Sequence, residues 1–545
     1  MKIKNLNKLI LYFFFSFYLL IGIYTLNDYG VNIEEHTQFY SGFYWLNYIF
    51  EFFEINSLRD IILENLNTIS KDKDLPNPAI YTYGPVFDVP LAFIDVILKN
   101  DESNYFFKYR HFGVFIIFYL SSIIFFKIVL QRFNNFFVSL FGTSLYIFSP
   151  RIYGDSFHNN KDIIFLSLVV FAIYFAFKIF KKKKIKYIIL FSLVASLATS
   201  TRIIGIFLPA SVILFLYLEL LNFKHKNNLK VIFIIFFLYI LFLILHWPYL
   251  WESPIENFIK FILRSKEWVF SYYILFNGKY YLTTNLPDSF VFTWIGISSP
   301  ILNLILFICG FYILVRRLFL RFITIDPSKE FHCDFWRSKK EMRDNFIIFN
   351  FISIMSILIF LNVSLASGWR HLYFLNFFIT YIAIFFLNIC FTKLTKYKVK
   401  LSLILLLLLI PNIYKLIIFH PYQSLYLNEI LNNEKKNSFL IDREGLTRFD
   451  SIKKILSLEN KEKKINIGNA SFIPYYRIKD VLPINEKKRI NFVGREFDQA
   501  DYIYNNFVYE INPEFNNKYQ IPPNFKKIYE LEINGIKMYE IWKKG

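Results

Sequence analysis

Long apolar runs bounded by charged residues most limit what this chain can fold into. A helix needs about 20 apolar residues to cross the hydrocarbon layer of a membrane, and about eleven such runs occur. We therefore predict a mainly α-helical, polytopic membrane protein whose first span is retained as an anchor and not removed as a signal peptide. The runs lie near residues 8–26, 112–131, 135–150, 163–180, 187–201, 203–221, 231–247, 291–314, 346–365, 372–390 and 401–419.

The composition agrees with a membrane body followed by a polar tail. Of the 545 residues, 55% are hydrophobic and only 19% are charged, which is too apolar for an ordinary soluble enzyme. The formal net charge is +20, but no aromatic and basic groove motif accompanies it, so we expect no nucleic-acid partner. The three cysteines all precede the tail and therefore give it no disulfide framework.

Basic clusters in alternate loops predict the direction of the spans, because cytoplasmic loops carry an excess of lysine and arginine. The clusters lie near residues 181–186, 224–230, 316–321 and 393–400. We predict a multi-pass protein of the plasma (inner) membrane with a cytoplasmic N-terminus. The tail would then be non-cytoplasmic, together with loops 27–111, 151–162, 248–290 and 367–371.

The predicted domains are a membrane domain at 1–419 and a small non-cytoplasmic α/β domain at 420–545. In the tail, a helical stretch near 445–458 precedes β-like runs at 465–467, 490–493 and 502–504. Asn534-Gly535 between runs 528–533 and 536–541 predicts a hairpin with a type I′ turn.

The first predicted outside loop carries Glu34-Glu35-His36 just after the first span, and the amphipathic stretch Phe39 to Phe53 follows it. Paired carboxylates beside the membrane surface suit a base that acts on a lipid-linked substrate. The same residues also suit an ordinary helix N-terminus, where acidic side chains oppose the helix dipole. Residue types alone favour the second interpretation.

The loop from Pro150 to Asp162 is dense in polar residues for a short connector between spans. Ionisable groups at the bilayer edge are costly unless they are paired or used in function, and a local Lys161/Asp162 ion pair is an equally good explanation. Arg202 and the segment Gly368-Trp369-Arg370-His371 add cations on the same predicted side, where arginine would suit phosphate oxygens. The candidate donor-binding residues are Arg151, Asp155, His158, Asn159, Lys161, Asp162, Arg202, Arg370 and His371.

The sequence contains no tight His-x-x-x-His metal motif, no phosphate-binding glycine loop and no nucleotide fingerprint. We therefore assign no metal ligands, while a divalent metal cofactor stays open. An ATP-driven transporter lacks support for the same reason.

Together these residues resemble the GT-C glycosyltransferases, most closely the protein O-mannosyltransferase type (glycosyltransferase family 39) and its bacterial relatives. The resemblance covers the membrane body. It is carried by Glu34-Glu35-His36, Tyr83-Gly84-Pro85, Arg110-His111, Pro150-Arg151, His158-Asn159-Asn160-Lys161-Asp162, Thr201-Arg202 with Gly205, Trp247-Pro248, Trp369-Arg370-His371 and His420-Pro421-Tyr422.

The resemblance implies transfer of a sugar from a polyprenyl-phosphate donor to an acceptor protein, lipid or glycan on the non-cytoplasmic face. In such relatives an acidic residue of the first outside loop, usually Asp, is the base, and here Glu34 takes that position with Glu35 as a helper. Reaction with a single base would invert the anomeric centre. The other functions considered are a transporter or flippase for lipid-linked sugars and a structural subunit of an envelope assembly.

Overall fold

The computed structural model describes residues 5–69, 82–98, 103–223, 227–266, 272–323, 335–360, 365, 368–460, 462–510 and 517–545. Within these ranges nine helices are long and apolar enough to cross a membrane. They are α1 (Asn5–Thr25), α5 (Ser103–Phe133), α8 (Asp162–Lys181), α10 (Phe207–Phe223), α11 (Asn227–His246), α14 (Ile301–Ile323), α15 (Lys339–Phe360), α16 (Leu375–Lys393) and α17 (Lys398–Ile418). Two shorter apolar helices, α6 (Phe136–Ile147) and α9 (Ile185–Thr201), fall at the two remaining predicted runs. The predicted mainly helical, polytopic fold is confirmed.

Two of the predicted runs do not form one continuous α-helix. The run 291–314 is divided into α13 (Phe290–Ser298) and α14, and Ser299 between them has an extended backbone. Pro300 explains the break, because proline disfavours helical geometry in the residue before it. The run 203–221 begins with the 3₁₀ turn Ile203–Ile206 before α10. Of a third run, 346–365, residues 361–364 lie outside the described residues.

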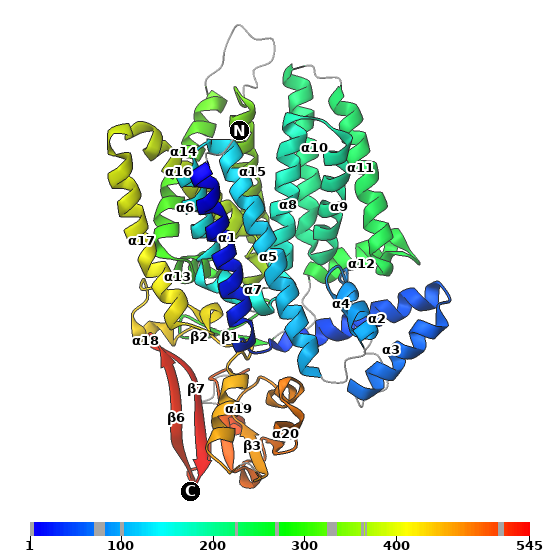
Figure 1. Cartoon of the computed structure of the whole chain (residues 1–545), viewed down its shortest axis with the longest axis vertical. Coiled ribbons are helices and arrows are strands. Elements are labelled where there is room, and N and C mark those ends of the chain that lie inside the picture. Colours follow the sequence, from blue (N-terminus) through cyan, green and yellow to red (C-terminus); the bar gives the residue numbers. More distant parts are fainter. Residues whose placement is uncertain are drawn as a thin grey trace.

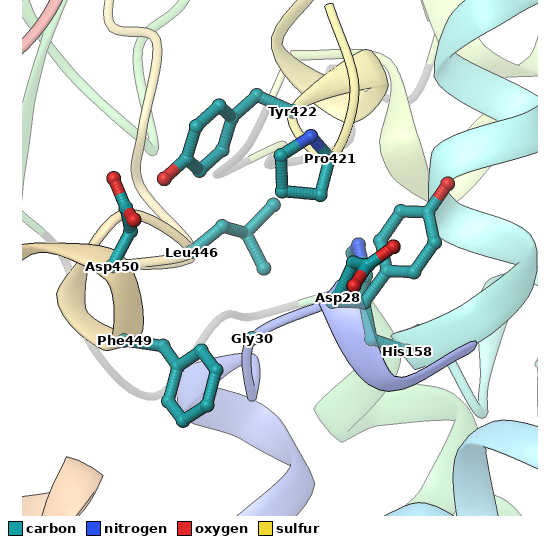
Figure 2. A pocket seen from close by; sticks show the side chains of 9 residues that line it. Asp28, Gly30, His158, Pro421, Tyr422, Leu446, Phe449 and Asp450 are labelled. Atoms are coloured by element: carbon teal, nitrogen blue, oxygen red, sulfur yellow. The ribbon is translucent and has the colours of Figure 1, made fainter. Parts of the chain in front are cut away.

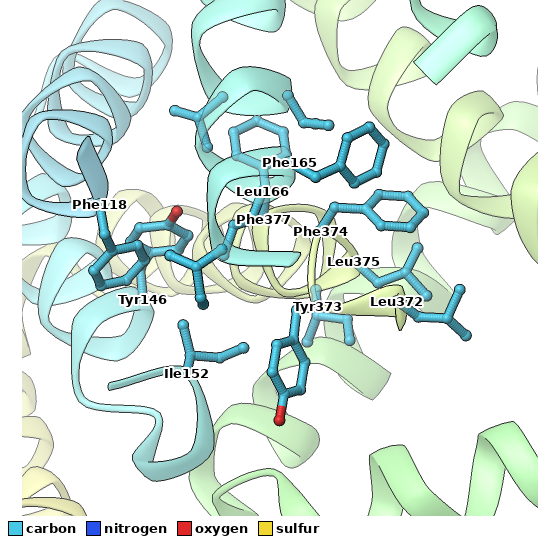
Figure 3. Packing of buried hydrophobic residues seen from close by; sticks show 14 of the residues in the cluster. Phe118, Tyr146, Ile152, Phe165, Leu166, Leu372, Tyr373, Phe374, Leu375 and Phe377 are labelled. Carbon is cyan, nitrogen blue, oxygen red and sulfur yellow. The ribbon is translucent and has the colours of Figure 1, made fainter. Parts of the chain in front are cut away.

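The centre of the helical body is built around α8 and α16. These helices are buried over 78% and 72% of their most apolar windows, whereas α1 and α17 are buried over only 17%. Aromatic and branched side chains from α5, α6, α8 and α16 meet in this centre, including Phe118, Tyr146, Phe165 and Phe377 (Figure 3). The outer helices α1 and α17 present most of their apolar surface outward, as expected for helices that face lipid.

The two ends of the helical body differ in what they carry. The start of α1 lies at one end, and the C-terminal sheet lies at the other (Figure 1). Near that second end, α2 (Ile33–Phe52) and α3 (Asn56–Ile69) run across the direction of the long helices. Further short helices of the chain are α4 (Asp88–Leu98), α7 (Pro150–His158), α12 (Pro254–Lys266), α18 (Asn433–Lys436) and α20 (Ile484–Lys487).

The tail folds around a mixed five-stranded sheet in the order β4-β3-β5-β7-β6. Strand β3 (Ile465–Asn469) is parallel to β4 (Ile490–Gly494) and β5 (Tyr502–Asn505), while β7 (Ile536–Lys544) is antiparallel to β5 and β6 (Phe525–Ile533). Asn534 and Gly535 have φ angles of 53° and 79°, as a type I′ turn requires. The helix α19 (Arg448–Ser457), the three β-like runs and the hairpin were all predicted; the small hairpin β1 (Tyr273–Phe276) and β2 (Lys279–Leu282) was not.

Candidate active site

The N-terminus of α2 fixes Glu34 and Glu35 in different environments. The side chain of Asn32 caps the helix by accepting from the Glu34 N–H at 2.9 Å, and Glu35 Oε1 accepts from the Asn32 N–H at 2.7 Å. Such a reciprocal capping box satisfies otherwise unpaired amides. The other oxygen of Glu35 lies 2.9 Å from His111 Nε2, so both oxygens of this buried side chain are engaged. The Glu34 side chain, in contrast, is 38% exposed.

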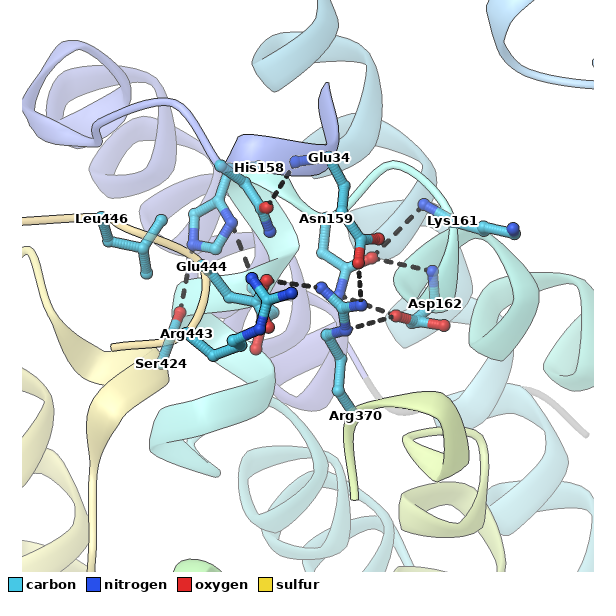
Figure 4. Close-up of polar contacts among 12 residues, drawn as sticks. Glu34, His158, Asn159, Lys161, Asp162, Arg370, Ser424, Arg443, Glu444 and Leu446 are labelled. Carbon is cyan, nitrogen blue, oxygen red and sulfur yellow. Dashed lines mark hydrogen bonds and ion pairs between the residues drawn. The ribbon is translucent and has the colours of Figure 1, made fainter. Parts of the chain in front are cut away.

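Arg370 lies at the centre of a group of carboxylates that come from distant parts of the chain. Its Nη2 donates to Glu34 Oε1 at 2.5 Å and its Nη1 donates to Glu444 Oε2 at 2.7 Å, while its Nε lies 3.2 Å from Asp162 Oδ2 (Figure 4). The Arg370 side chain is only 4% exposed. We call Arg370, Glu34, Asp162, Glu444 and Arg202 the Arg370 cluster.

The beginning of α8 positions Asp162 in this cluster. Asn159 Oδ1 accepts from the backbone N–H groups of Lys161 and Asp162 at 3.3 and 2.8 Å, and Asn159 Nδ2 donates to Asp162 Oδ2 at 3.1 Å. Arg202, just after α9, forms an ion pair with Asp162 Oδ1. The structure thus brings Asn159 and Asp162, at the end of the loop 151–162, together with Arg202 and Arg370, which were predicted on the same side of the membrane.

Lys161 lies beside the cluster but faces an aromatic ring. Its Nζ is 2.9 Å from the centroid of the Tyr83 ring, an arrangement in which the ring face attracts the cation. Burial and the neighbouring Arg202 lower the pKa of Lys161 to about 7, although Glu34 and Asp162 act in the opposite direction. A lysine in this state supplies a cation that is titratable near neutral pH.

The cluster also controls the protonation of Glu34 and His371. Burial raises the pKa of Glu34, but the Arg370 charge and its hydrogen bond outweigh burial, so the pKa falls from 4.5 to about 2. Burial and the charges of Arg202 and Arg370 hold the pKa of His371 well below its usual range. Glu34 is thus an anion and His371 a neutral imidazole at physiological pH.

The remaining candidate residues hold α7 against its neighbours. Asp155 accepts from the Tyr373 hydroxyl at 2.6 Å, and burial is the main cause that raises its pKa to about 7. His158 Nε2 lies 3.1 Å from Ser424 Oγ, and Arg151 Nε donates to the Tyr426 carbonyl at 2.9 Å. These three side chains connect α7 to the start of the tail and to the segment before α16.

A small pocket adjoins this region between the residues that precede α2 and the tail. Gly30 and His158 are among the residues that line it (Figure 2). Tyr29, Tyr422 and Phe449 supply aromatic walls, and Asp28 and Asp450 supply carboxylates.

Sequence reasoning missed Glu444 and the contact of Lys161 with Tyr83. Glu444 lies in a charged stretch after the last span, and no local pattern separates it from other surface acids. Across the described residues, no group of three or more His, Cys, Asp and Glu side chains is arranged to hold a metal ion.

The comparison with protein families gives a match for part of the chain. Residues 106–251 match the dolichyl-phosphate-mannose-protein mannosyltransferase family. The matched segment runs from α5 to Trp251 and contains the 151–162 loop and Arg202, whereas Glu34, Arg370 and Glu444 lie outside it. No curated protein matches the chain. The match confirms the predicted resemblance to GT-C mannosyltransferases and indicates a mannosyltransferase-like glycosyltransferase.

Proposed function

We propose that this protein transfers a sugar from a polyprenyl-phosphate donor to an acceptor hydroxyl on the non-cytoplasmic face of the membrane. One observation carries the proposal: Glu34, a partly exposed carboxylate, pairs with Arg370 at one end of the helical body, and Arg370 also binds Asp162, which in turn pairs with Arg202. The family match supports the class of reaction. A nucleotide sugar is not expected on this side of the membrane, so the donor is lipid-linked.

Glu34 is the proposed base. It takes the proton of the acceptor hydroxyl as the acceptor oxygen bonds to the anomeric carbon of the sugar. The bond between that carbon and the phosphate oxygen breaks, and its electron pair leaves with polyprenyl phosphate. Attack opposite the leaving group inverts the anomeric centre.

The leaving phosphate gains negative charge and therefore needs cations more than an acid. Arg370, Arg202 and Lys161 are the cations that we assign to it, because arginine matches phosphate oxygens with parallel hydrogen bonds. Neutral His371, 3.4 Å from Arg370 Nη2, is a hydrogen-bonding group for the phosphate or the sugar. Glu35 orients α2 through its cap and its contact with His111.

The test uses purified protein in liposomes with radiolabelled polyprenyl-phosphate sugars and measures the release of polyprenyl phosphate. We expect release by the wild type and none by Glu34→Gln, which keeps the size of the side chain. Movement of intact labelled lipid across the bilayer by both proteins, without consumption of donor, would identify a transporter and overturn the proposal. Turnover retained by Glu34→Gln would remove the base assignment.

A further inference from the structure

Glu444 lies in a hydrogen-bonded turn at residues 442–447, between the last span and α19. The Asp442 carboxylate fixes this turn by accepting from the N–H groups of Leu446 and Thr447 at 2.8 and 3.3 Å and from the Thr447 hydroxyl at 2.6 Å. Asp442 is only 1% exposed. The turn therefore holds Glu444 in a defined place.

The same turn also holds the start of α2. The Ile33 N–H donates to the Glu444 carbonyl oxygen at 3.0 Å, and Arg448 Nη2 donates to the Val31 carbonyl at 2.9 Å. A Cβ atom at Gly30 would lie 2.8 Å from the Leu446 carbonyl oxygen, so only glycine allows this close approach. The tail thus sets the position of the helix end that carries Glu34.

Glu444 and Glu34 bind different nitrogens of one guanidinium, because Glu444 accepts from Nη1 and Glu34 accepts from Nη2. A guanidinium presents its donors in a fixed fork. A ligand can therefore replace Glu34 at Nη2 while Glu444 continues to hold Nη1.

We propose that Glu444 is a positioning residue of the transfer reaction, which keeps Arg370 in place while Nη2 passes from Glu34 to the donor phosphate. This inference rests on the proposed function. Binding of the phosphate frees the Glu34 carboxylate from its ion pair, so that it can take the acceptor proton. When the bond between the anomeric carbon and the phosphate oxygen breaks, Arg370 remains beside the phosphate because Glu444 still holds it.

Glu444 also limits the positive charge of the site. Without the Glu444 charge, the donor phosphate would meet a more positive site and bind more tightly, but Arg370 would no longer be held in place when the bond to the phosphate breaks. For a variant without the Glu444 charge we therefore predict tighter donor binding together with slower chemistry. Purely structural damage would weaken binding and slow turnover together.

Steady-state kinetics in liposomes with a labelled polyprenyl-phosphate sugar test the inference. We expect Glu444→Gln to lower kcat about tenfold and to lower the donor KM a few-fold. Glu444→Asp keeps the charge and should recover part of the kcat. Glu459→Gln is the matched control, because this tail carboxylate binds Lys463, Tyr502 and Lys543 and its loss should leave both constants unchanged.

The outcomes separate the two proposals. Wild-type protein that consumes no donor overturns both. If the wild type turns over donor and Glu444→Gln has the same kcat and KM, only the role of Glu444 is overturned. A raised KM together with a lowered melting temperature in Glu444→Gln also overturns only that role. Should Glu444→Gln fail to accumulate, Glu444→Asp carries the test: it should lower kcat without raising the donor KM, and a raised KM would overturn the inference.

Discussion

Two polar clusters at the ends of the long helices contain similar ion pairs but differ in their surroundings. In the Arg370 cluster, one arginine is shared among three carboxylates. In the second cluster, Asp344 is shared by Arg132, Arg317 and the Tyr381 hydroxyl. We call these four residues the Asp344 cluster.

The clusters differ in which member is open to a ligand. The Asp344 side chain has no exposed surface, and its partners lie on α5, α14 and α16, so its bonds join helices near the loops predicted to be cytoplasmic. In the Arg370 cluster, Glu34 is 38% exposed and Glu444 comes from the tail, while Lys161 lies beside the cluster and faces the Tyr83 ring. A buried ion network alone therefore does not mark an active site; a network that leaves a carboxylate accessible beside several cations is a better indicator.

Among the variants of residues around Glu34, the largest kinetic effect is expected from Arg370→Lys. Lysine keeps the positive charge but cannot offer separate nitrogens in a fixed fork to Glu34, Glu444 and a phosphate. Transfer should fall about a hundredfold, measured as donor consumption. Arg132→Lys in the Asp344 cluster is the matched control and should change the melting temperature more than the turnover; equal turnover losses in both variants would remove the distinction between the clusters.

A smaller effect is expected from Lys161, and it depends on pH. Its pKa is lowered to about 7, so the cation is present below this pH and is lost as the pH rises through it. The kcat/KM for donor, which reports on the free enzyme, should therefore decline above about pH 7. Lys161→Arg should move this decline to higher pH, and Lys161→Met should remove it and lower kcat/KM at pH 6 about tenfold. An unchanged pH profile in both variants would exclude Lys161 as the titrating group.

The smallest effect is expected from Glu35→Gln. This change keeps an oxygen for the cap of α2 but weakens the contact with His111, so kcat should fall only a few-fold. The comparison with its neighbour Glu34 is the informative part. A loss at Glu35 as large as that of Glu34→Gln would give both carboxylates a direct role.

Much of the fold was predictable because its signals are local. Apolar length identified the spans, and Asn534-Gly535 identified the hairpin from two residues. Pro300 was also visible, but the apolar run continues on both sides of it, so composition alone did not predict the break between α13 and α14.

The candidate site was predictable in part. The alternation of basic loops predicted that Glu34, Asp162, Arg202 and Arg370 share one side of the membrane, and the structure brings them into contact. Glu444 was not predictable, because its role depends on how the tail packs against α2. That packing rests on long-range bonds such as the one from Arg448 to Val31, for which a single sequence carries no signal.

The most direct test compares Glu34→Gln with Asp344→Asn for donor turnover and thermal unfolding in the same detergent. Glu34→Gln should lose its measurable turnover, by at least about a thousandfold, with little change in melting temperature. Asp344→Asn leaves the partly buried Arg132 and Arg317 without their anion and should lose about 3 kcal/mol of stability, while the molecules that remain folded turn over donor at nearly the wild-type rate. The reverse pattern, with Glu34→Gln active and Asp344→Asn folded but inactive, would contradict the assignment of the Arg370 cluster as the active site.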